Sequence, residues 1–328
     1  MDRDILVPGS VANLGGGFDT LAVAVQLYLR ARIVDVRADG GSRLEVVSSR
    51  PTVKGRNAVE RAFAAIARHA MGSVPTVFVE IESDIPMAAG LGSSAAAAVA
   101  GLRIFECVTA PVPETTLLAT ATALEGHADN AAAALLAGMT SVVESDPPSP
   151  SGFGETGPPS PGGFGVARES VRALRWEWPS DLRFIVATPF TGLPTSKARA
   201  ALAPTISRKD AVFNLQRVLS LVHALQNGEY DRLREALQDR WHQPARAALV
   251  PHLGAVLAID DPDVLGAFLS GAGPSVAVVA RRDFARVERL LQATCEAAGS
   301  PVTVRTLAAH SCSDVRRDAV ASAPGRTA

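Results

Sequence analysis

The sequence has few cysteines, few aromatic residues and no long apolar segment, and each scarcity excludes a class of protein. Its three cysteines, Cys107, Cys295 and Cys312, are widely spaced and odd in number, which argues against a disulfide framework or a zinc cluster and suits a reducing compartment. No uncharged apolar run reaches the length of about 18 residues that a membrane span needs. Residues 1–8 contain no apolar core of signal-peptide length, so we expect a cytoplasmic protein.

Neither positive nor negative charge is in excess. The chain of 328 residues has a formal net charge of -1 and 47% hydrophobic residues, which is typical of a soluble globular protein of about two domains. A balanced charge provides no electrostatic attraction for nucleic acid or for an anionic membrane. We therefore expect a small-molecule partner, with neither nucleic acid nor membrane involved.

Two common nucleotide-binding motifs are missing. The Walker pattern G-x-x-x-x-G-K-[ST] occurs nowhere in the chain, and residues 271–276 (GAGPSV) do not complete G-x-G-x-x-G. The sequence therefore excludes a P-loop of the Walker type and lacks a dinucleotide fingerprint at its second glycine pair.

The most informative stretch is residues 86–96, PMAAGLGSSAA, which follows an apolar segment at 77–81 that reads as a strand. Gly90 and Gly92 permit backbone angles that larger residues avoid. Ser93 or Ser94 is expected to cap the helix that the following alanines form. A helix start directs free N–H groups at one point, which suits a phosphate. The glycines alone are equally compatible with a tight turn before a buried helix.

The rest of the chain alternates predicted strands and helices without a strict βαβ rhythm, which favours an α+β fold in two layers. We expect a first domain at 1–145, a Pro/Gly/Ser-rich insertion at 146–165, a second domain at 166–310 and a frayed tail at 311–328. The predicted strands are 5–7, 27–36, 77–81, 183–187, 276–280 and 302–304, and the predicted helices are 57–70, 113–137 with an interruption at 126–130, 210–227, 230–241 and 283–298.

The whole string P-x-x-x-G-L-G-S-S-A-A resembles the phosphate loop of the GHMP small-molecule kinases. Two further glycine-bearing segments, 13–19 and 270–275, occur in the order in which that family places its three nucleotide- and substrate-binding loops. The resemblance implies a ribosomal-S5-like N-terminal domain, a ferredoxin-like C-terminal domain, and the use of ATP with Mg²⁺.

Four segments resemble the homoserine kinase group of this family. They are VPGSVANLGGGFD at 7–19, EGHADN at 125–130, TSKAR at 195–199 and HQPAR at 242–246. The resemblance implies phosphorylation of the side-chain hydroxyl of L-homoserine, in threonine biosynthesis, by a homodimer. Gly16, Ala128 and Ala245 depart from the group's usual residues, but each departure leaves the polar groups of its segment in place.

The resemblance assigns roles to individual residues. Carboxylates can hold the ammonium of homoserine, and arginines offer planar donor forks for its carboxylate. The implied substrate contacts are Asn13, Asp19, His127, Asp129, Thr195, Arg199 and Arg246. Asn130 and Arg199 are the implied catalytic residues. The implied ATP contacts are Asn57, Pro86, Met87, Ala88, Ala89, Gly90, Leu91, Gly92, Ser93, Ser94, Ala95 and Ala96.

The expected metal site is the least complete part of the pattern. Many GHMP kinases carry a magnesium-binding glutamate eleven residues before the position of Asn130, where this chain has Ala119. Ser94 and Glu125 are the candidate magnesium contacts instead. Two alternatives stay open: a GHMP kinase for another small alcohol, and a catalytically silent paralogue that binds ligands, for which Ala119 is the supporting feature.

Overall fold

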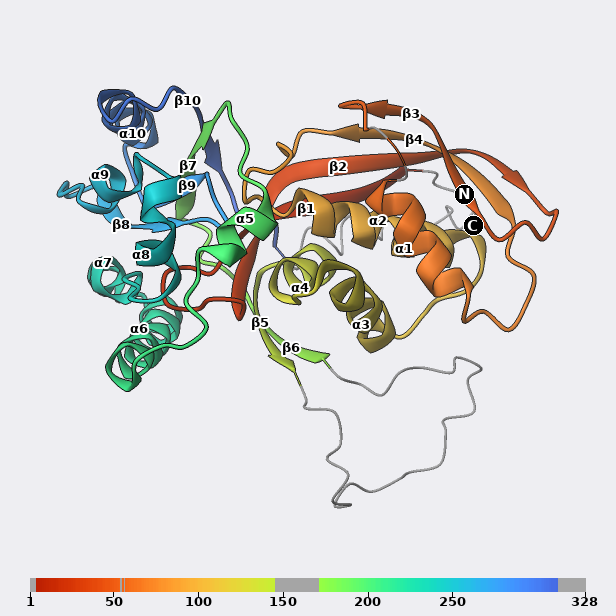
Figure 1. Cartoon of the computed structure of the whole chain (residues 1–328), viewed down its shortest axis with the longest axis horizontal. Helices are drawn as coiled ribbons and strands as arrows, with labels where there is room; N and C mark the ends of the chain where they lie inside the picture. The colour runs from red at the N-terminus through yellow and green to blue at the C-terminus, as the bar shows by residue number, and fades with distance from the viewer. Residues whose placement is uncertain (1–3, 54, 56, 145–170, 312–328) are drawn as a thin grey trace, which may run out of the picture.

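The computed structural model describes residues 4–53, 55, 57–144 and 171–311. The insertion predicted at 146–165 and residues 312–328 of the predicted tail lie outside the described residues. The described chain forms two sheets, each with helices packed against it, so the α+β fold predicted from the sequence is confirmed (Figure 1).

The first sheet has the strand order β3-β4-β2-β5-β6, with β1 paired to β2. Its centre is the 17-residue strand β2, which pairs antiparallel with β1, β4 and β5. Four helices pack on this part of the chain, on the side of the sheet seen below β2 in Figure 1. The elements are β1 Asp4–Ala12, β2 Leu21–Arg37, β3 Leu44–Arg50, α1 Ala58–Ala67, β4 Thr76–Ser83, α2 Ser93–Val108, α3 Glu114–Glu125, α4 Asp129–Leu136, β5 Met139–Glu144 and β6 Val171–Trp176.

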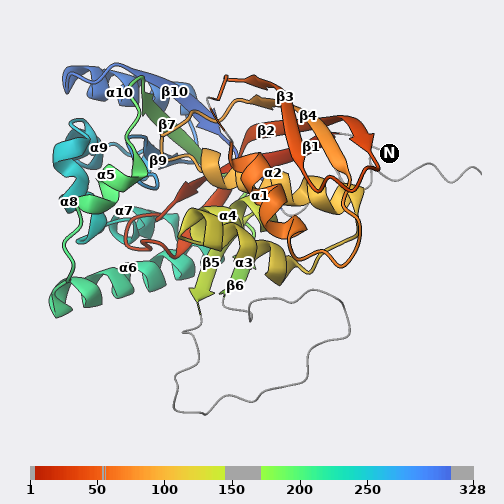
Figure 2. The same ribbon diagram turned by 45° about the vertical axis from the view of Figure 1, so that its right-hand side comes forward.

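The second sheet is antiparallel, with the order β10-β7-β9-β8. Its central strand β9 is buried along its whole length. Figure 2 shows the second sheet and its helices beside the first sheet, and Figure 1 shows α5 at the boundary between the two halves. The elements are β7 Arg183–Pro189, α5 Thr195–Ala200, α6 Arg208–Asn227, the 3₁₀ turn Tyr230–Arg232, α7 Leu233–Ala236, α8 His242–Arg246, the 3₁₀ turn Ala247–Leu249, α9 Leu253–Leu257, β8 Val264–Leu269, β9 Val276–Ala280, α10 Phe284–Ala297 and β10 Val302–Leu307.

Three features differ from the sequence-based expectations. Strand β6 pairs with β5 in the first sheet, whereas the sequence analysis groups it with the second half of the chain. The segment 230–241 is a 3₁₀ turn followed by the short helix α7, rather than one amphipathic helix. The sequence also showed no clear signal for β3, β5 or β6, because edge and short strands carry few alternating apolar residues.

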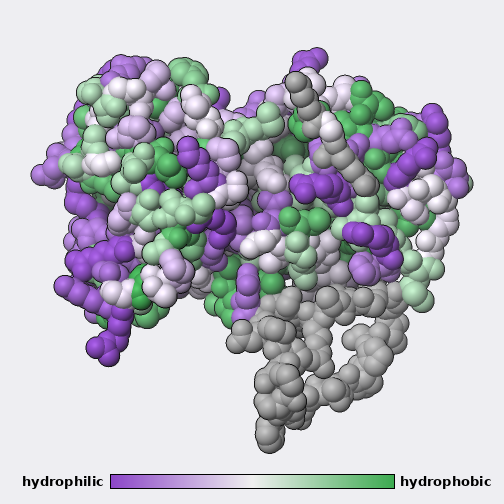
Figure 3. Space-filling model, in the orientation of Figure 1, coloured by the Kyte–Doolittle hydropathy of each residue, from purple (hydrophilic) through white to green (hydrophobic). Residues whose placement is uncertain are grey.

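Hydrophilic and hydrophobic residues are interspersed over the face that is visible in Figure 3. Among the described residues, every helix is too short or too polar to cross a membrane.

Helices α1 and α2 meet closely because α2 carries a glycine at the contact. A side-chain carbon at Gly101 would lie 2.2 Å from the carbonyl oxygen of Val59 and 3.0 Å from Cβ of Ala62. Phe63 of α1 packs edge-on against Phe105 of α2 with ring centroids 5.8 Å apart. The backbone of α2 is thereby fixed against α1, which positions the glycine loop at the start of α2.

We predict that Gly101→Ala destabilises the protein, although alanine favours a helix by about 1 kcal/mol over glycine. The added methyl group overlaps a backbone carbonyl that cannot rotate away, so we expect a net loss of about 1–3 kcal/mol in the free energy of unfolding. Urea denaturation measures the change. The matched control is Gly254→Ala in α9, where a side-chain carbon meets no atom within 4 Å; an equal loss in both variants would contradict the packing argument.

Candidate active site

The loop before α2 is held by its carbonyl groups. The carbonyl oxygens of Ala88 and Ala89 accept hydrogen bonds from the backbone N–H groups of Leu193 (2.8 Å) and Ser275 (3.2 Å). The carbonyl oxygen of Gly90 accepts from the hydroxyl of Ser270 at 2.7 Å. Because the first N–H groups of a helix have no acceptor within the helix, the start of α2 remains a donor surface suited to an anion.

Gly90 and Gly92 are required by this geometry. Their φ angles are +76° and +71°, and side-chain carbons there would lie 2.2 Å from the carbonyl oxygen of Ser270 and 2.3 Å from Oγ of Ser10, respectively. Gly92 is the N-cap of α2, with no side-chain cap. The expectation that Ser93 or Ser94 caps the helix is therefore wrong, because the left-handed turn at Gly92 places both serines inside the first helical turn.

The first glycine-bearing segment, 13–19, forms a strained loop at the end of β1. Asn13, Leu14 and Asp19 all have positive φ angles, of 73°, 45° and 51°. The side-chain amide of Asn13 holds the loop from inside: it donates to the carbonyl oxygen of Gly271 at 2.8 Å and accepts from the N–H of Asp19 at 3.2 Å. Strain concentrated in one loop is typical of functional sites.

Asp19 and Arg199 bind each other. The two guanidinium nitrogens Nη1 and Nη2 of Arg199 each donate to one carboxylate oxygen of Asp19 at 2.9 Å, and both side chains are about one-third exposed. The sequence analysis assigns these groups to opposite ends of a zwitterion. Their pairing shows that the two complementary charges lie side by side, 180 residues apart in the chain.

Arg246 is buried, with 1% of its surface exposed. It donates to the carbonyl oxygens of Ala198 (3.2 Å) and Gly271 (3.0 Å) and to Nδ1 of His242 (3.3 Å). His242 in turn contacts the carbonyl oxygen of Gly15 through Nε2 at 2.9 Å. These two partners select the tautomer of His242 with its proton on Nε2, and burial lowers the pKa of His242 below its usual 6.5.

His127, Asp129 and Asn130 form a connected group where α4 begins. Oδ1 of Asp129 lies 2.7 Å from Nδ1 of His127 and accepts from both the backbone N–H (2.8 Å) and Nδ2 (3.2 Å) of Asn130. Burial of His127 disfavours its charged form, but the hydrogen bond and charge of Asp129 outweigh it, so the pKa of His127 is raised above 6.5. The Asp129 carboxylate therefore favours the protonated form of the His127 imidazole, which lines the cavity.

Ser94 and Glu125 meet across the start of α2. The Ser94 hydroxyl donates to Oε1 of Glu125 at 2.8 Å. Within the described ranges, no group of three or more His, Cys, Asp or Glu residues has metal-binding geometry. One carboxylate and one hydroxyl are nevertheless the hard oxygen donors that Mg²⁺ takes when the phosphates of a nucleotide and water complete its shell. The donor set therefore fits a nucleotide-bound magnesium.

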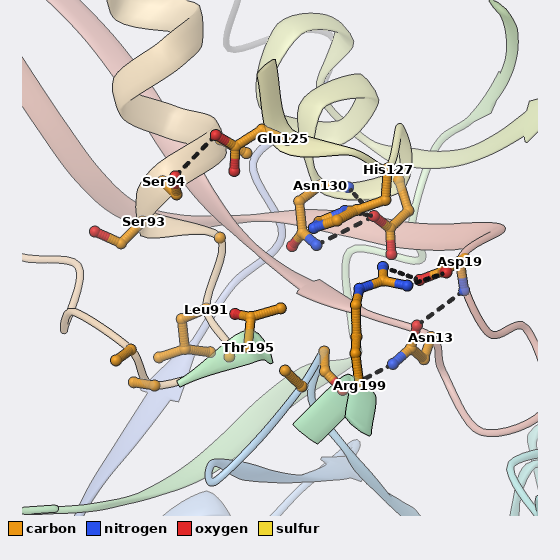
Figure 4. Close-up of a pocket in the computed structure, with 18 of the residues that line it drawn as sticks. Asn13, Asp19, Leu91, Ser93, Ser94, Glu125, His127, Asn130, Thr195 and Arg199 are labelled. Atoms are coloured by element: carbon orange, nitrogen blue, oxygen red, sulfur yellow. Dashed lines mark hydrogen bonds and ion pairs between the residues drawn. The ribbon is translucent and has the colours of Figure 1, made fainter. Parts of the chain in front are cut away.

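One cavity between the two halves collects most of the predicted residues (Figure 4). All seven implied substrate contacts line it, with Asn130, Ser94, Glu125 and the loop residues Pro86, Ala88, Ala89, Gly90, Leu91, Gly92, Ser93 and Ala95. Met87, Ala96 and Asn57 are not among the lining residues. Asn57 caps α1, where its side chain accepts from the N–H of Glu60, and its contact with adenine stays a prediction.

Three further residues line the cavity, Phe18, Gly271 and Ala272. Their segments, 13–19 and 270–275, were expected to form binding loops, but these three residues were not among the expected contacts. The ring of Phe18 stacks on His242 with centroids 5.4 Å apart, and the guanidinium of Arg246 lies 5.2 Å from its centroid. An apolar residue between two polar loop motifs carries no chemical signal of its own. The clue to Phe18 in the sequence is its place in the segment 13–19, directly before Asp19.

Comparison with known proteins agrees with this architecture. Residues 57–138 match the family described as GHMP kinases N terminal domain, and residues 221–298 match GHMP kinases C terminal. A homoserine kinase of Solibacter usitatus is 36% identical over 293 residues, covering 87% of this chain and 88% of the relative. A homoserine kinase of Deinococcus radiodurans is 36% identical over 274 residues, covering 83% of this chain and 82% of the relative.

Solved structures share the fold. The crystal structure of homoserine kinase from Cytophaga hutchinsonii superposes with a TM-score of 0.75 at 23% identity, covering 95% of this chain and 97% of that one. Phosphomevalonate kinase of Streptococcus pneumoniae superposes with a TM-score of 0.62 at 12% identity, covering 92% and 99%. Fold and cavity together define an ATP-dependent small-molecule kinase. The chain belongs to the GHMP kinase family.

We predict that Asp129→Asn lowers the pKa of His127. The substitution removes the negative charge and leaves burial, which disfavours the imidazolium. In the unmodified protein, the interaction of protonated His127 with Asp129 adds to the free energy of unfolding. This contribution is present in full below pH 6.5, the unfolded-state pKa, and is lost as the pH rises through the raised folded-state pKa. An NMR titration of the His127 ring, assigned with His127→Gln, measures the shift. An unchanged pKa in Asp129→Asn would contradict the assignment of the shift to this carboxylate.

Proposed function

We propose that this protein is a homoserine kinase, which transfers the γ-phosphoryl group of ATP to the side-chain hydroxyl of L-homoserine. The observation that carries the proposal is the composition of one cavity. At one end lie the loop 86–96 and the donor N–H groups of α2, and at the other end lie paired charges that match an amino-acid zwitterion. The curated homoserine kinases that resemble the chain along more than four-fifths of its length support it.

In this proposal the zwitterion replaces an internal ion pair. Arg199 exchanges the carboxylate of Asp19 for that of homoserine, and Asp19 accepts the ammonium in return, so each charged group keeps a partner of opposite sign. The Asp129 carboxylate adds negative charge near the ammonium. Arg246, buried and tied to backbone carbonyls, contributes positive charge from the wall of the cavity. The reactive hydroxyl then extends toward Asn130 and the phosphate loop.

The proposed transfer is an in-line displacement. The hydroxyl oxygen of homoserine forms a bond to the γ-phosphorus, the bond between that phosphorus and the bridging oxygen breaks, ADP leaves, and the hydroxyl proton passes to the transferred phosphate. Such transfers depend mainly on positioning and charge neutralisation. Asn130 orients the hydroxyl, since an amide cannot act as a base. The N–H groups at the start of α2 neutralise phosphate charge.

The nucleotide and its metal belong to the same proposal. Ser94 and Glu125 would hold Mg²⁺, which neutralises charge on the phosphates. Their hydrogen bond at 2.8 Å supports Glu125 as the carboxylate that stands in for the glutamate missing at Ala119. A homodimer remains an expectation from the family resemblance, and a cytoplasmic location remains an expectation from the sequence.

A coupled ADP-release assay tests the proposed function. It uses ATP and Mg²⁺ with homoserine, threonine, serine, mevalonate and galactose in parallel. We predict strong turnover with L-homoserine alone. Mevalonate and galactose lack the two charges that match the Asp19 and Arg199 pair, and the hydroxyl groups of serine and threonine lie one carbon closer to those charges and therefore fall short of the phosphate loop. Turnover with an uncharged alcohol only would replace the substrate assignment, and ATP binding without turnover of any substrate would favour the silent paralogue.

We predict that Glu125→Gln raises the Mg²⁺ concentration at half-maximal rate by about tenfold or more, because an amide oxygen lacks the charge of the carboxylate and binds Mg²⁺ more weakly. The concentration of Mg²⁺ at half-maximal rate measures the effect at fixed ATP. The matched control is Glu114→Gln at the other end of α3, in its first turn, which should leave that concentration unchanged. A Glu125→Gln enzyme with normal magnesium dependence would contradict the proposed metal site.

A further inference from the structure

Ser10 is a buried serine in β1 with 0% of its surface exposed, and it does not line the cavity. Its hydroxyl donates a hydrogen bond of 2.8 Å to Oδ1 of Asn130, which lies 120 residues later in the chain. Its backbone N–H donates to the carbonyl oxygen of Leu91 at 3.1 Å. Ser10 therefore contacts both Asn130 and the phosphate loop, and neither the sequence motifs nor the proposed reaction has assigned a role to its side chain.

Gly92 makes room for this contact. A side-chain carbon at Gly92 would lie 2.3 Å from Oγ of Ser10 and 3.1 Å from Oδ1 of Asn130. The hydrogen-bonded pair thus lies directly against the loop that precedes α2. A hydroxyl that is buried this tightly and bound to a residue of the cavity wall restricts how that residue can rotate.

The amide of Asn130 is held at both ends. Oδ1 accepts from Ser10, and Nδ2 donates one of its two hydrogens to Oδ1 of Asp129 at 3.2 Å. A flipped amide would set its oxygen against the Asp129 carboxylate, so Asp129 selects the orientation and Ser10 restrains the amide plane. The second hydrogen on Nδ2 remains for the oxygen of a substrate hydroxyl.

We infer that Ser10 is a positioning residue for phosphoryl transfer: it fixes the Asn130 amide so that Nδ2 donates to the accepting hydroxyl of the substrate. This inference rests on the proposed kinase function. Ser10 acts through Asn130 and touches no reacting atom. It sets the direction of one hydrogen bond in the transition state, so its loss affects turnover rather than the binding of either substrate.

The test compares kcat and KM of Ser10→Ala, Asn130→Ala and the double variant, with L-homoserine, ATP and Mg²⁺. We expect Ser10→Ala to lower kcat by about tenfold, the value of one buried hydrogen bond, while KM for both substrates changes less than about twofold. Once Asn130 is replaced, the hydroxyl of Ser10 has no amide to orient, so removing it should not lower kcat further. The double variant should therefore match Asn130→Ala in kcat.

The matched control is Thr140→Val in β5, which removes another fully buried hydroxyl of the same sheet, bound to the carbonyl oxygen of Ala22. It should leave kcat unchanged. A further tenfold loss in the double variant, or an unchanged kcat in Ser10→Ala, would overturn the inference. If Ser10→Ala does not fold, Ser10→Cys keeps a weaker donor and should show a smaller fall in kcat at constant KM; an unchanged kcat in a folded Ser10→Cys enzyme would then overturn the inference.

The failure of the proposed function has a different signature. An unmodified protein that turns over another alcohol but not homoserine contradicts the substrate assignment, while the comparison of Ser10 and Asn130 variants with that alcohol still decides the role of Ser10. An unmodified protein with no turnover of any substrate overturns both.

Discussion

The carbonyl oxygen of Gly271 accepts hydrogen bonds from two long-range partners, Nδ2 of Asn13 and Nη1 of Arg246. The neighbouring Ser270 hydroxyl binds the carbonyl oxygen of Gly90. Through two consecutive residues, the loop between β8 and β9 thus joins the strained loop after β1, the helix α8 and the phosphate loop. Strand β1 belongs to the first sheet, whereas β8 and β9 belong to the second. This loop therefore joins the two halves at the cavity, together with the Asp19–Arg199 ion pair and the hydrogen bond from the N–H of Leu193 to the carbonyl oxygen of Ala88.

The two ends of the cavity differ in their electrostatics. The end near α2 offers backbone N–H groups, which favour an anion without a fixed positive charge. The other end contains the ion pair of Asp19 with Arg199, and the carboxylate of Asp129 beside the imidazole of His127. A zwitterion can enter such an end at low cost, because every ion pair that it breaks is replaced by another. A substrate with one charge leaves a protein group without its partner.

Local sequence signals predicted the parts of the site that depend on neighbours in the chain. The glycines at 90 and 92 followed by alanines predicted a glycine loop that runs into a helix, because backbone freedom and helix propensity are local properties. Only the family resemblance identified that loop as a phosphate loop. The capping residue was misjudged, since tertiary hydrogen bonds to Ala88, Ala89 and Gly90 decide where the helix begins. The pairing of β6 with β5 was equally out of reach, because pairing with a short edge strand leaves little trace in composition.

Interactions between distant residues were predicted only through the family resemblance. It named Asp19, Asp129, Arg199 and Arg246 as neighbours, and all four line one cavity. It did not indicate that Asp19 and Arg199 bind each other, or that the guanidinium of Arg246 binds the backbone carbonyls of Ala198 and Gly271. Ser10 was passed over because a serine in an apolar strand has no distinguishing neighbours; only the fold brings it to Asn130.

We propose that homoserine lies with its hydroxyl toward α2 and its charged groups toward Asp19 and Arg199. The most direct measurement is paramagnetic relaxation of carbon-13-labelled homoserine bound with a non-hydrolysable ATP analogue and Mn²⁺ in place of Mg²⁺. We expect the hydroxyl-bearing carbon to relax fastest and the carboxylate carbon slowest, because the hydroxyl lies nearer to Mn²⁺ in the proposed orientation. The reverse gradient, or equal relaxation along the molecule, would contradict it.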